Sequence, residues 1–369
     1  GGGGGGGVGG AGAGRGRMRR LVANGAGVPE AVAEASSPAE GPEKRLRAWH
    51  DLEASRRGMT PELWEVLQSD RVTDVVINGC AAFADSGAGL SPVDVGVEDV
   101  DGGVALAVHM AAAAGRRLDD ASPIVDAVLP GPVRLHAVLP PISQGGASIS
   151  LRTLRPSPFT LQQLVEGGSL SGEVADRLAK AVENKRSILI SGATGAGKTT
   201  LLASLLGLVD DAARIVVIEE VTELSVDHPH VVSLQARPAN IEGEGGLGLE
   251  ELVRAAMRMR PDRLVLGECR GGELREVLTA FNTGHGGGFV TLHANSVEDV
   301  PARLLALGTL AGLDRLTIGA LAASAFDLVA HLERGEDGLR KVVALGHFEF
   351  DGVSLSARTD VRTNTLGPN

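Results

Sequence analysis

Eight consecutive residues in the middle of the chain match the phosphate-binding pattern G-x-x-x-x-G-K-[ST] at every specified position. They are Gly192, Ala193, Thr194, Gly195, Ala196, Gly197, Lys198 and Thr199, followed by Thr200. Glycines let the backbone curl so that successive N–H groups point at phosphate oxygens, and the start of the next helix adds a positive dipole end. In such loops the lysine reaches the β- and γ-phosphates, and the hydroxyl of the last residue holds Mg²⁺. The pattern therefore predicts that Lys198 and Thr199 bind ATP with Mg²⁺ and that the protein hydrolyses ATP.

Acidic residues at the ends of two later apolar segments could activate the attacking water. Glu219 and Glu220 end one of these segments, and Glu268 ends the other. The segment before Glu268 has the apolar character and terminal acid of a Walker B element, although Gly267 stands where most phosphate-loop proteins carry an aspartate that organises Mg²⁺. Because the sequence also lacks the LSGGQ signature and the N-K-x-D motif, ABC-type ATPases and GTPases are disfavoured. Both Glu268 and Glu219 stay open as the general base.

Two histidines flank a glycine-rich segment and a short apolar strand further along the chain. His285 precedes the predicted strand Phe289–Leu292, and His293 follows it. Ligands of parallel sheets bind at the carboxyl edge of the strands, so both histidines could face the nucleotide. A histidine at that place can respond to the γ-phosphate through hydrogen bonding and through its protonation state.

The sequence around these motifs predicts the elements that position them. Over residues 183–369, apolar strands alternate with helices, which predicts an α/β domain with a parallel sheet covered on both faces. Within it, Ser296–Asp299 has the pattern of a capping box that opens a helix. Residues 43–155 mix short helices and strands without a phosphate loop, so we predict a smaller α+β domain with a leading helix. A linker and a helix are expected over 156–182, and a disordered, glycine-rich tail over 1–42.

The composition of the 369-residue chain narrows the classes of function. Its formal net charge of −11 disfavours general binding of nucleic acid, which requires clustered lysines and arginines. The two cysteines, Cys80 and Cys269, lack the spacing of metal ligands. No stretch has the length and apolar character of a membrane-spanning helix. We therefore expect a soluble cytoplasmic protein that acts at a membrane only through partners.

Taken together, the motifs resemble those of the secretion ATPase superfamily of type II and type IV secretion systems. The resemblance is closest to the tight-adherence (Flp) pilus assembly ATPases. Four blocks carry it in the same order, namely the phosphate loop, an Asp box at 218–224, a Walker B region at 259–272 and a His box at 283–295. Segments similar to the family's N-terminal domain lie at 73–79, 115–119, 123–126 and 148–152.

This resemblance implies roles for individual residues. Glu268 would be the general base or would position the attacking water, and Glu219 and Glu220 would organise Mg²⁺ and water, Glu220 holding the ion through water. His293, together with His285, would sense the γ-phosphate. From the N-terminal domain, Arg134 and Arg152 would contact phosphates.

The resemblance also implies an assembly. A RecA-like P-loop ATPase domain, preceded by the smaller α+β domain, would form a homo-hexameric ring that uses ATP and Mg²⁺. The ring would work at the inner face of the cell membrane through an inner-membrane platform protein of a pilus or secretion system. The four-cysteine zinc element of some type II export ATPases is absent from the sequence, so no zinc is expected.

Three alternatives to a pilus motor stay open. The first is a type IV secretion or conjugation ATPase that moves protein or a DNA–protein complex. The second is a nucleotide-binding scaffold that hydrolyses little ATP, which the intact Lys198, Thr199 and Glu268 disfavour. The third is a DNA-translocating motor, which the acidic balance of the chain disfavours.

Overall fold

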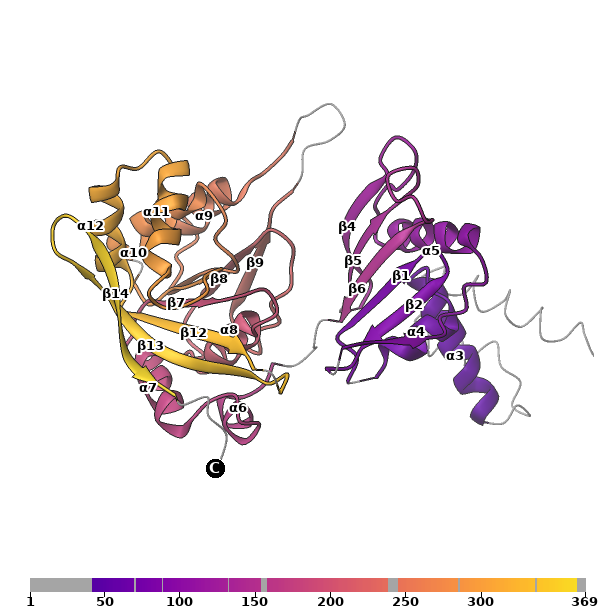
Figure 1. Ribbon diagram of the computed structural model, residues 1–369, viewed down its shortest axis with the longest axis horizontal. Coiled ribbons are helices and arrows are strands. Elements are labelled where there is room, and N and C mark those ends of the chain that lie inside the picture. Colours follow the sequence, from indigo (N-terminus) through magenta and orange to yellow (C-terminus); the bar gives the residue numbers. More distant parts are fainter. Residues whose placement is uncertain are drawn as a thin grey trace, which may run out of the picture. The chain divides into compact units, whose positions relative to one another are not determined.

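The computed structural model describes residues 42–363, apart from 70, 88, 132, 154–157, 238–244, 285 and 336. The chain divides into two compact units on either side of the boundary between Leu154 and Arg155 (Figure 1). Residues 1–41 of the predicted tail lie outside the described residues, as do the first residues of the predicted linker. No helix in the described part of the chain combines the length and the apolar character needed to cross a membrane.

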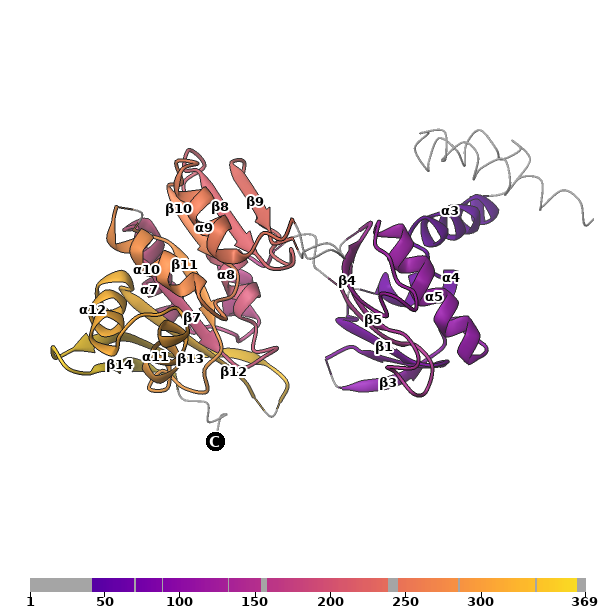
Figure 2. The same cartoon turned by 90° about the horizontal axis from the view of Figure 1, so that it is seen from above.

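The first unit is an antiparallel sheet of six strands with helices packed on it. Its strand order is β3-β2-β1-β6-β5-β4, with β1 (Asp74–Asn78), β2 (Ala81–Asp85), β3 (Leu90–Val93), β4 (Ile124–Leu129), β5 (Val133–Val138) and β6 (Ser148–Thr153). Alternate residues of β4, β5 and β6 are buried, as expected for strands with one face on a core. The helices are α3 (Pro42–Arg56), α4 (Pro61–Leu67) and α5 (Val100–Ala113). The last of these packs on β4 and β5 (Figure 2).

The second unit contains a sheet of eight strands in the order β14-β13-β12-β7-β11-β10-β8-β9. Every neighbouring pair from β12 to β9 is parallel, whereas β13 and β14 extend the sheet by antiparallel pairing. The strands are β7 (Ile188–Gly192), β8 (Ile215–Glu219), β9 (Val231–Gln235), β10 (Arg263–Leu266), β11 (Phe289–Leu292), β12 (Leu328–Arg334), β13 (Arg340–Phe350) and β14 (Leu355–Arg362).

Helices cover both faces of this sheet, which gives it two separate cores (Figure 2). One core is formed with α9 (Leu249–Met257), α10 (Glu273–Asn282), α11 (Val300–Leu310) and α12 (Arg315–Ala325). The other is formed with α6 (Leu161–Glu166), α7 (Gly172–Glu183) and α8 (Lys198–Leu206). All residues of β7, β8, β10 and β11 are buried, because both faces of these strands are covered. The predicted α/β fold, with a smaller α+β domain before it, is confirmed.

The start of α11 differs from the predicted capping box. The helix begins at Val300, and the residue before it, Asp299, makes no side-chain cap. Asp299 N does donate to Ser296 Oγ at 3.1 Å, but these residues form a turn ahead of the helix. The carboxylate of the neighbouring Glu298 accepts hydrogen bonds from Thr359 and Arg362 on β14.

Candidate nucleotide-binding site

The second unit brings the ends of four parallel strands together at one edge of its sheet. In the order β7-β11-β10-β8, these strands are followed by the phosphate loop, His293, Glu268 and Glu220. Residues that are far apart in the sequence therefore meet, because the carboxyl ends of parallel strands lie at the same edge. This is the edge at which the sequence places the nucleotide.

The loop between β7 and α8 has a backbone that only glycine adopts easily. Gly192, Gly195 and Gly197 have φ angles of 151°, 74° and 95°. At Gly192 a Cβ would also lie 2.5 Å from the carbonyl oxygen of Leu332, so no side chain fits there. Gly197 is the N-cap of α8, and no side chain caps that helix end. The free N–H groups of the first turn are thus available for an anion.

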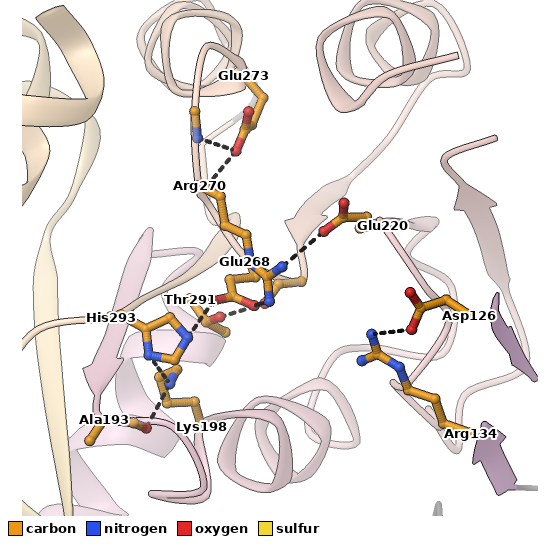
Figure 3. A network of polar contacts seen from close by, with 12 residues as sticks. Asp126, Arg134, Ala193, Lys198, Glu220, Glu268, Arg270, Glu273, Thr291 and His293 are labelled. Carbon is orange, nitrogen blue, oxygen red and sulfur yellow. Dashed lines mark hydrogen bonds and ion pairs between the residues drawn. The ribbon is translucent and has the colours of Figure 1, made fainter. Parts of the chain in front are cut away.

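Lys198 is 8% exposed and fills the inside of the loop. Its Nζ donates to the carbonyl oxygens of Gly192 and Ala193, each at 2.9 Å, and lies 3.2 Å from His293 Nδ1 (Figure 3). Burial lowers the pKa of Lys198 from its ordinary value, and the nearby Glu268 opposes this effect. The ammonium group therefore rests on backbone oxygens that a phosphate would replace.

His293 joins the lysine to the carboxylate of Glu268. Its Nδ1 faces the Lys198 ammonium and so must accept, which leaves the proton on Nε2, the nitrogen in contact with Glu268 Oε1. Burial and the charge of Lys198 lower the pKa of His293, with Glu268 opposing them. A neutral imidazole with one accepting and one donating nitrogen fits both neighbours.

Glu268 is the central group of a chain of charged contacts. Its Oε2 accepts from Arg270 Nη2 at 2.6 Å, and Arg270 Nη1 donates to Glu220 Oε2 at 3.0 Å (Figure 3). Its Oε1 is buried and lies against His293 Nε2. Burial raises the pKa of Glu268, but Arg270, His293 and Lys198 together outweigh it, so the net pKa is lowered. The carboxylate is ionised, and its two oxygens face Arg270 and His293.

The side chain of Glu219 has different hydrogen-bond partners from that of Glu268. Its side chain is buried, and Oε1 accepts from the backbone N–H groups of Glu223 and Leu224 at 3.1 and 3.0 Å. A Cβ at Gly267 would lie 2.7 Å from Glu219 Cγ. Glu219 thus occupies the space that a side chain at position 267 would need, which explains why a glycine stands there. Its observed contacts order the turn after β8.

The remaining predicted site residues lie in several places. Thr199 and Thr200 follow Lys198 in the first turn of α8. Arg134 and Arg152 belong to the first unit, where they are cross-strand partners on β5 and β6. Arg134 lies 3.8 Å from Asp126 (Figure 3), and Arg152 Nε donates to Asp74 at 2.9 Å. His285 lies outside the described residues. The phosphate contacts of the two arginines stay predictions.

The residues present suit Mg²⁺ held together with a nucleotide. In phosphate-transfer sites this ion keeps several waters and takes only one or two protein ligands besides the substrate phosphates. Thr199, in the first turn of α8, and Glu220, after β8, offer such oxygens. In the described part of the chain no three His, Cys, Asp or Glu residues are grouped to hold a metal ion by themselves.

Sequence reasoning assigned no role to two arginines at this site. Arg270 lies within the Walker B region, but the pattern of that region does not predict that Arg270 forms ion pairs with both Glu268 and Glu220. Arg340 Nε donates to the carbonyl oxygen of Gly195 at 2.8 Å, across 145 residues of sequence. No local pattern around Arg340 could have placed it beside the loop.

A parallel sheet covered on both faces, with a glycine-rich phosphate loop and Lys198, His293 and Glu268 at its carboxyl edge, defines a RecA-like P-loop protein. A sequence model of the family described as type II/IV secretion system protein matches residues 101–336. The chain therefore belongs to the type II/IV secretion system protein family.

Two named relatives agree with this assignment, and a solved structure shares the fold. A Mycobacterium tuberculosis protein, whose name provisionally assigns it to conjugal transfer, is 45% identical over 76% of this chain and 82% of its own length. The type IV secretion system protein PtlH of Bordetella pertussis is 35% identical, over 65% of this chain and 79% of its own. The crystal structure of the pilus retraction motor PilT with bound ADP has a TM-score of 0.53 and 18% identity, and covers 86% of this chain and 83% of that chain. The likeness to PilT concerns the fold alone. A closer relation to tight-adherence pilus ATPases stays a prediction.

Proposed function

We propose that the protein is an ATP-hydrolysing hexameric motor that powers protein secretion or pilus assembly through an inner-membrane platform protein. The observation that carries this proposal is the contact chain Lys198–His293–Glu268, which joins the phosphate loop to an ionised carboxylate. The names of the relatives, which refer to conjugal transfer and type IV secretion, favour a type IV secretion or conjugation system over a pilus.

The resting contacts suggest how the residues would act in turn. When phosphates enter the loop, Lys198 exchanges the carbonyl oxygens of Gly192 and Ala193 for phosphate oxygens. This movement leaves His293 Nδ1 free to accept from, or after protonation donate to, a group at the γ-phosphate. The carboxylate of Glu268, once His293 turns away from it, orients a water for in-line attack and takes up its proton.

Mg²⁺, when bound, would neutralise charge on the β- and γ-phosphates. Thr199 would hold it directly, and Glu220 would hold it through water. Arg270 keeps Glu220 and Glu268 at a fixed separation, because its two terminal nitrogens bind one carboxylate each. This fork would place the metal-binding acid and the base on the same rigid support.

The test of the proposed function is phosphate release from Mg²⁺-ATP measured across protein concentration, with particle mass determined by light scattering in the same samples. A ring whose sites need neighbouring subunits should give activity that rises more steeply than linearly as the mass approaches that of a hexamer. ATP bound without phosphate release at any concentration would instead favour the scaffold alternative. Constant activity per chain in a monomeric sample would exclude the ring.

Replacing Arg270 with glutamine is expected to move the acid limb of the pH–rate profile to higher pH. Arg270 is the strongest of the groups that lower the pKa of Glu268, so its loss raises that pKa. A base must be deprotonated to act, and a higher pKa therefore requires a higher pH for half-maximal kcat/KM. The measurement is kcat/KM for ATP against pH, with the exposed Arg275→Gln on α10 as the matched control. An unchanged acid limb in Arg270→Gln would show that Glu268 does not set it.

A further inference from the structure

The β12–β13 hairpin runs along the phosphate loop. Pairing between β12 and β7 continues from Leu328 opposite Ile188 to Leu332 opposite Gly192, which is the first residue of the loop. There the two backbones approach so closely that the carbonyl oxygen of Leu332 fills the position of a side chain at Gly192. The hairpin is therefore in direct contact with the loop where the loop leaves the sheet.

A buried histidine fixes this hairpin to the candidate site. His331, on β12, is 2% exposed. Its Nε2 lies 3.0 Å from the carbonyl oxygen of Asn295, so this nitrogen donates, and its Nδ1 accepts from Ser191 Oγ at 2.9 Å. Ser191 directly precedes the phosphate loop, and Asn295 follows His293 by two residues. His331 thus bonds the hairpin to the segment before Lys198 and to the segment after His293.

Arg340, the first residue of β13, reaches from this hairpin to the phosphate loop. Its Nε donates to the carbonyl oxygen of Gly195 at 2.8 Å. Its side-chain carbons lie 3.2 and 3.3 Å from the position that a Cβ would take at Gly197. The aliphatic part of Arg340 therefore packs against one loop glycine while its Nε–H binds the carbonyl of another.

Two cations divide the carbonyl groups of the loop between them. Lys198 binds the oxygens of Gly192 and Ala193, and Arg340 binds that of Gly195. A phosphate site is built from N–H groups, and a carbonyl oxygen turned into it would repel the anion. When Lys198 moves to a phosphate, the carbonyl of Gly195 keeps its bond from Arg340, just as that of Ala193 keeps its bond from Ala196 N.

We propose that Arg340 is a positioning residue of the nucleotide site, which keeps the phosphate loop in its phosphate-binding shape through the Nε–H bond to Gly195. The proposal rests on the proposed function, since it presumes that the loop binds ATP. The charge of Arg340 is not needed for this role; a donor at the position of Nε is sufficient. The role concerns the diphosphate part of the nucleotide, so ATP and ADP are affected equally.

Three substitutions of Arg340 distinguish the effect of its Nε–H donor from the effect of its positive charge. Glutamine carries its amide nitrogen at the same point along the side chain as arginine Nε, so Arg340→Gln keeps the donor and removes the charge. Arg340→Lys keeps a positive charge but places its nitrogen one atom further out. Arg340→Ala removes both. Arg358→Ala, which removes an exposed arginine from the neighbouring strand β14, is the matched control.

The experiment measures the dissociation constants of ATP and ADP for the full-length chain by competition with a fluorescent ATP analogue. Arg340→Ala and Arg340→Lys are expected to weaken both nucleotides by about 3–10-fold, as for the loss of one hydrogen bond. Arg340→Gln and Arg358→Ala should stay within about twofold of wild type, and kcat at saturating ATP should change little in all four variants.

Results that differ from these would overturn either the role of Arg340 or the proposed function. Wild-type affinity in Arg340→Ala would overturn the positioning role. Weak binding in Arg340→Gln together with recovery in Arg340→Lys, and a larger loss for ATP than for ADP, would overturn it in favour of a direct charge contact with the γ-phosphate. A wild-type protein that binds ATP without hydrolysing it would refute only the proposed hydrolysis, because the comparison of affinities still decides the role of Arg340. A wild-type protein that binds no nucleotide would refute both.

Discussion

Phosphate release from ATP is expected to fall by about 10²–10³-fold when Lys198 is replaced by alanine, because the change removes the fixed charge nearest to the transferred phosphoryl group. In the resting protein this ammonium group is held inside the loop by two carbonyl oxygens at 2.9 Å, so it needs to move only a short way to reach a phosphate. Nucleotide affinity should fall as well, since the loop loses its one lysine. Steady-state phosphate release at saturating Mg²⁺-ATP, together with the dissociation constant of ADP, measures both effects.

The matched control is Lys180→Ala, which removes an exposed lysine from the last turn of α7 and should leave both quantities unchanged. Thermal unfolding without nucleotide shows whether Lys198→Ala still folds, because the substitution also leaves two loop carbonyls without their donor. A folded Lys198→Ala protein that releases phosphate at more than about a tenth of the wild-type rate would contradict the proposed function.

The sequence was sufficient to predict the α/β domain because its central strands are covered on both faces. Strands of this kind are continuous apolar runs, and β7, β8, β10 and β11 are of this kind. The phosphate loop adds a glycine pattern that is tied to one backbone shape, and that shape is present at Gly192, Gly195 and Gly197. In these segments local composition and tertiary environment favour the same structure.

Strands β3 and β14, at the margins of the two sheets, were not predicted. The final strand β14 has alternating exposed residues and little apolar content, and β3 is only four residues long with three of them exposed. Such strands are specified by the pairing they receive from a neighbour rather than by their own residues.

The sequence predicted which residues gather at the site, because residues that follow adjacent parallel strands meet at one edge of the sheet. Lys198, Glu268 and His293 follow three adjacent strands and meet at one edge, as their positions in the sequence indicate. The orientation of a carboxylate does not follow from its position. Glu219 and Glu268 both lie at strand ends, yet one accepts from backbone N–H groups and the other from Arg270. These contacts favour Glu268 as the general base, and the assignment stays a prediction.

Glu268→Gln is expected to lower phosphate release by about 10²–10⁴-fold while ATP still binds, because the amide cannot accept the proton of the attacking water. Glutamine keeps the size of the side chain and an oxygen that can accept from Arg270, so the loop and Lys198 should stay in place. The expected result is therefore a loss of kcat with a dissociation constant for ATP within a few-fold of wild type. Single-turnover phosphate release and equilibrium binding of the fluorescent ATP analogue measure the two quantities separately.

Glu219→Gln distinguishes the two candidate bases. Its amide oxygen can still accept from the N–H groups of Glu223 and Leu224, so the turn after β8 should be preserved. If Glu268 is the base, Glu219→Gln should keep phosphate release within about tenfold of wild type, whereas Glu268→Gln should not. Glu276→Gln on α10, which removes a carboxylate outside the site, controls for the loss of one negative charge. The reverse ranking, with the larger loss in Glu219→Gln, would contradict the assignment of the base to Glu268.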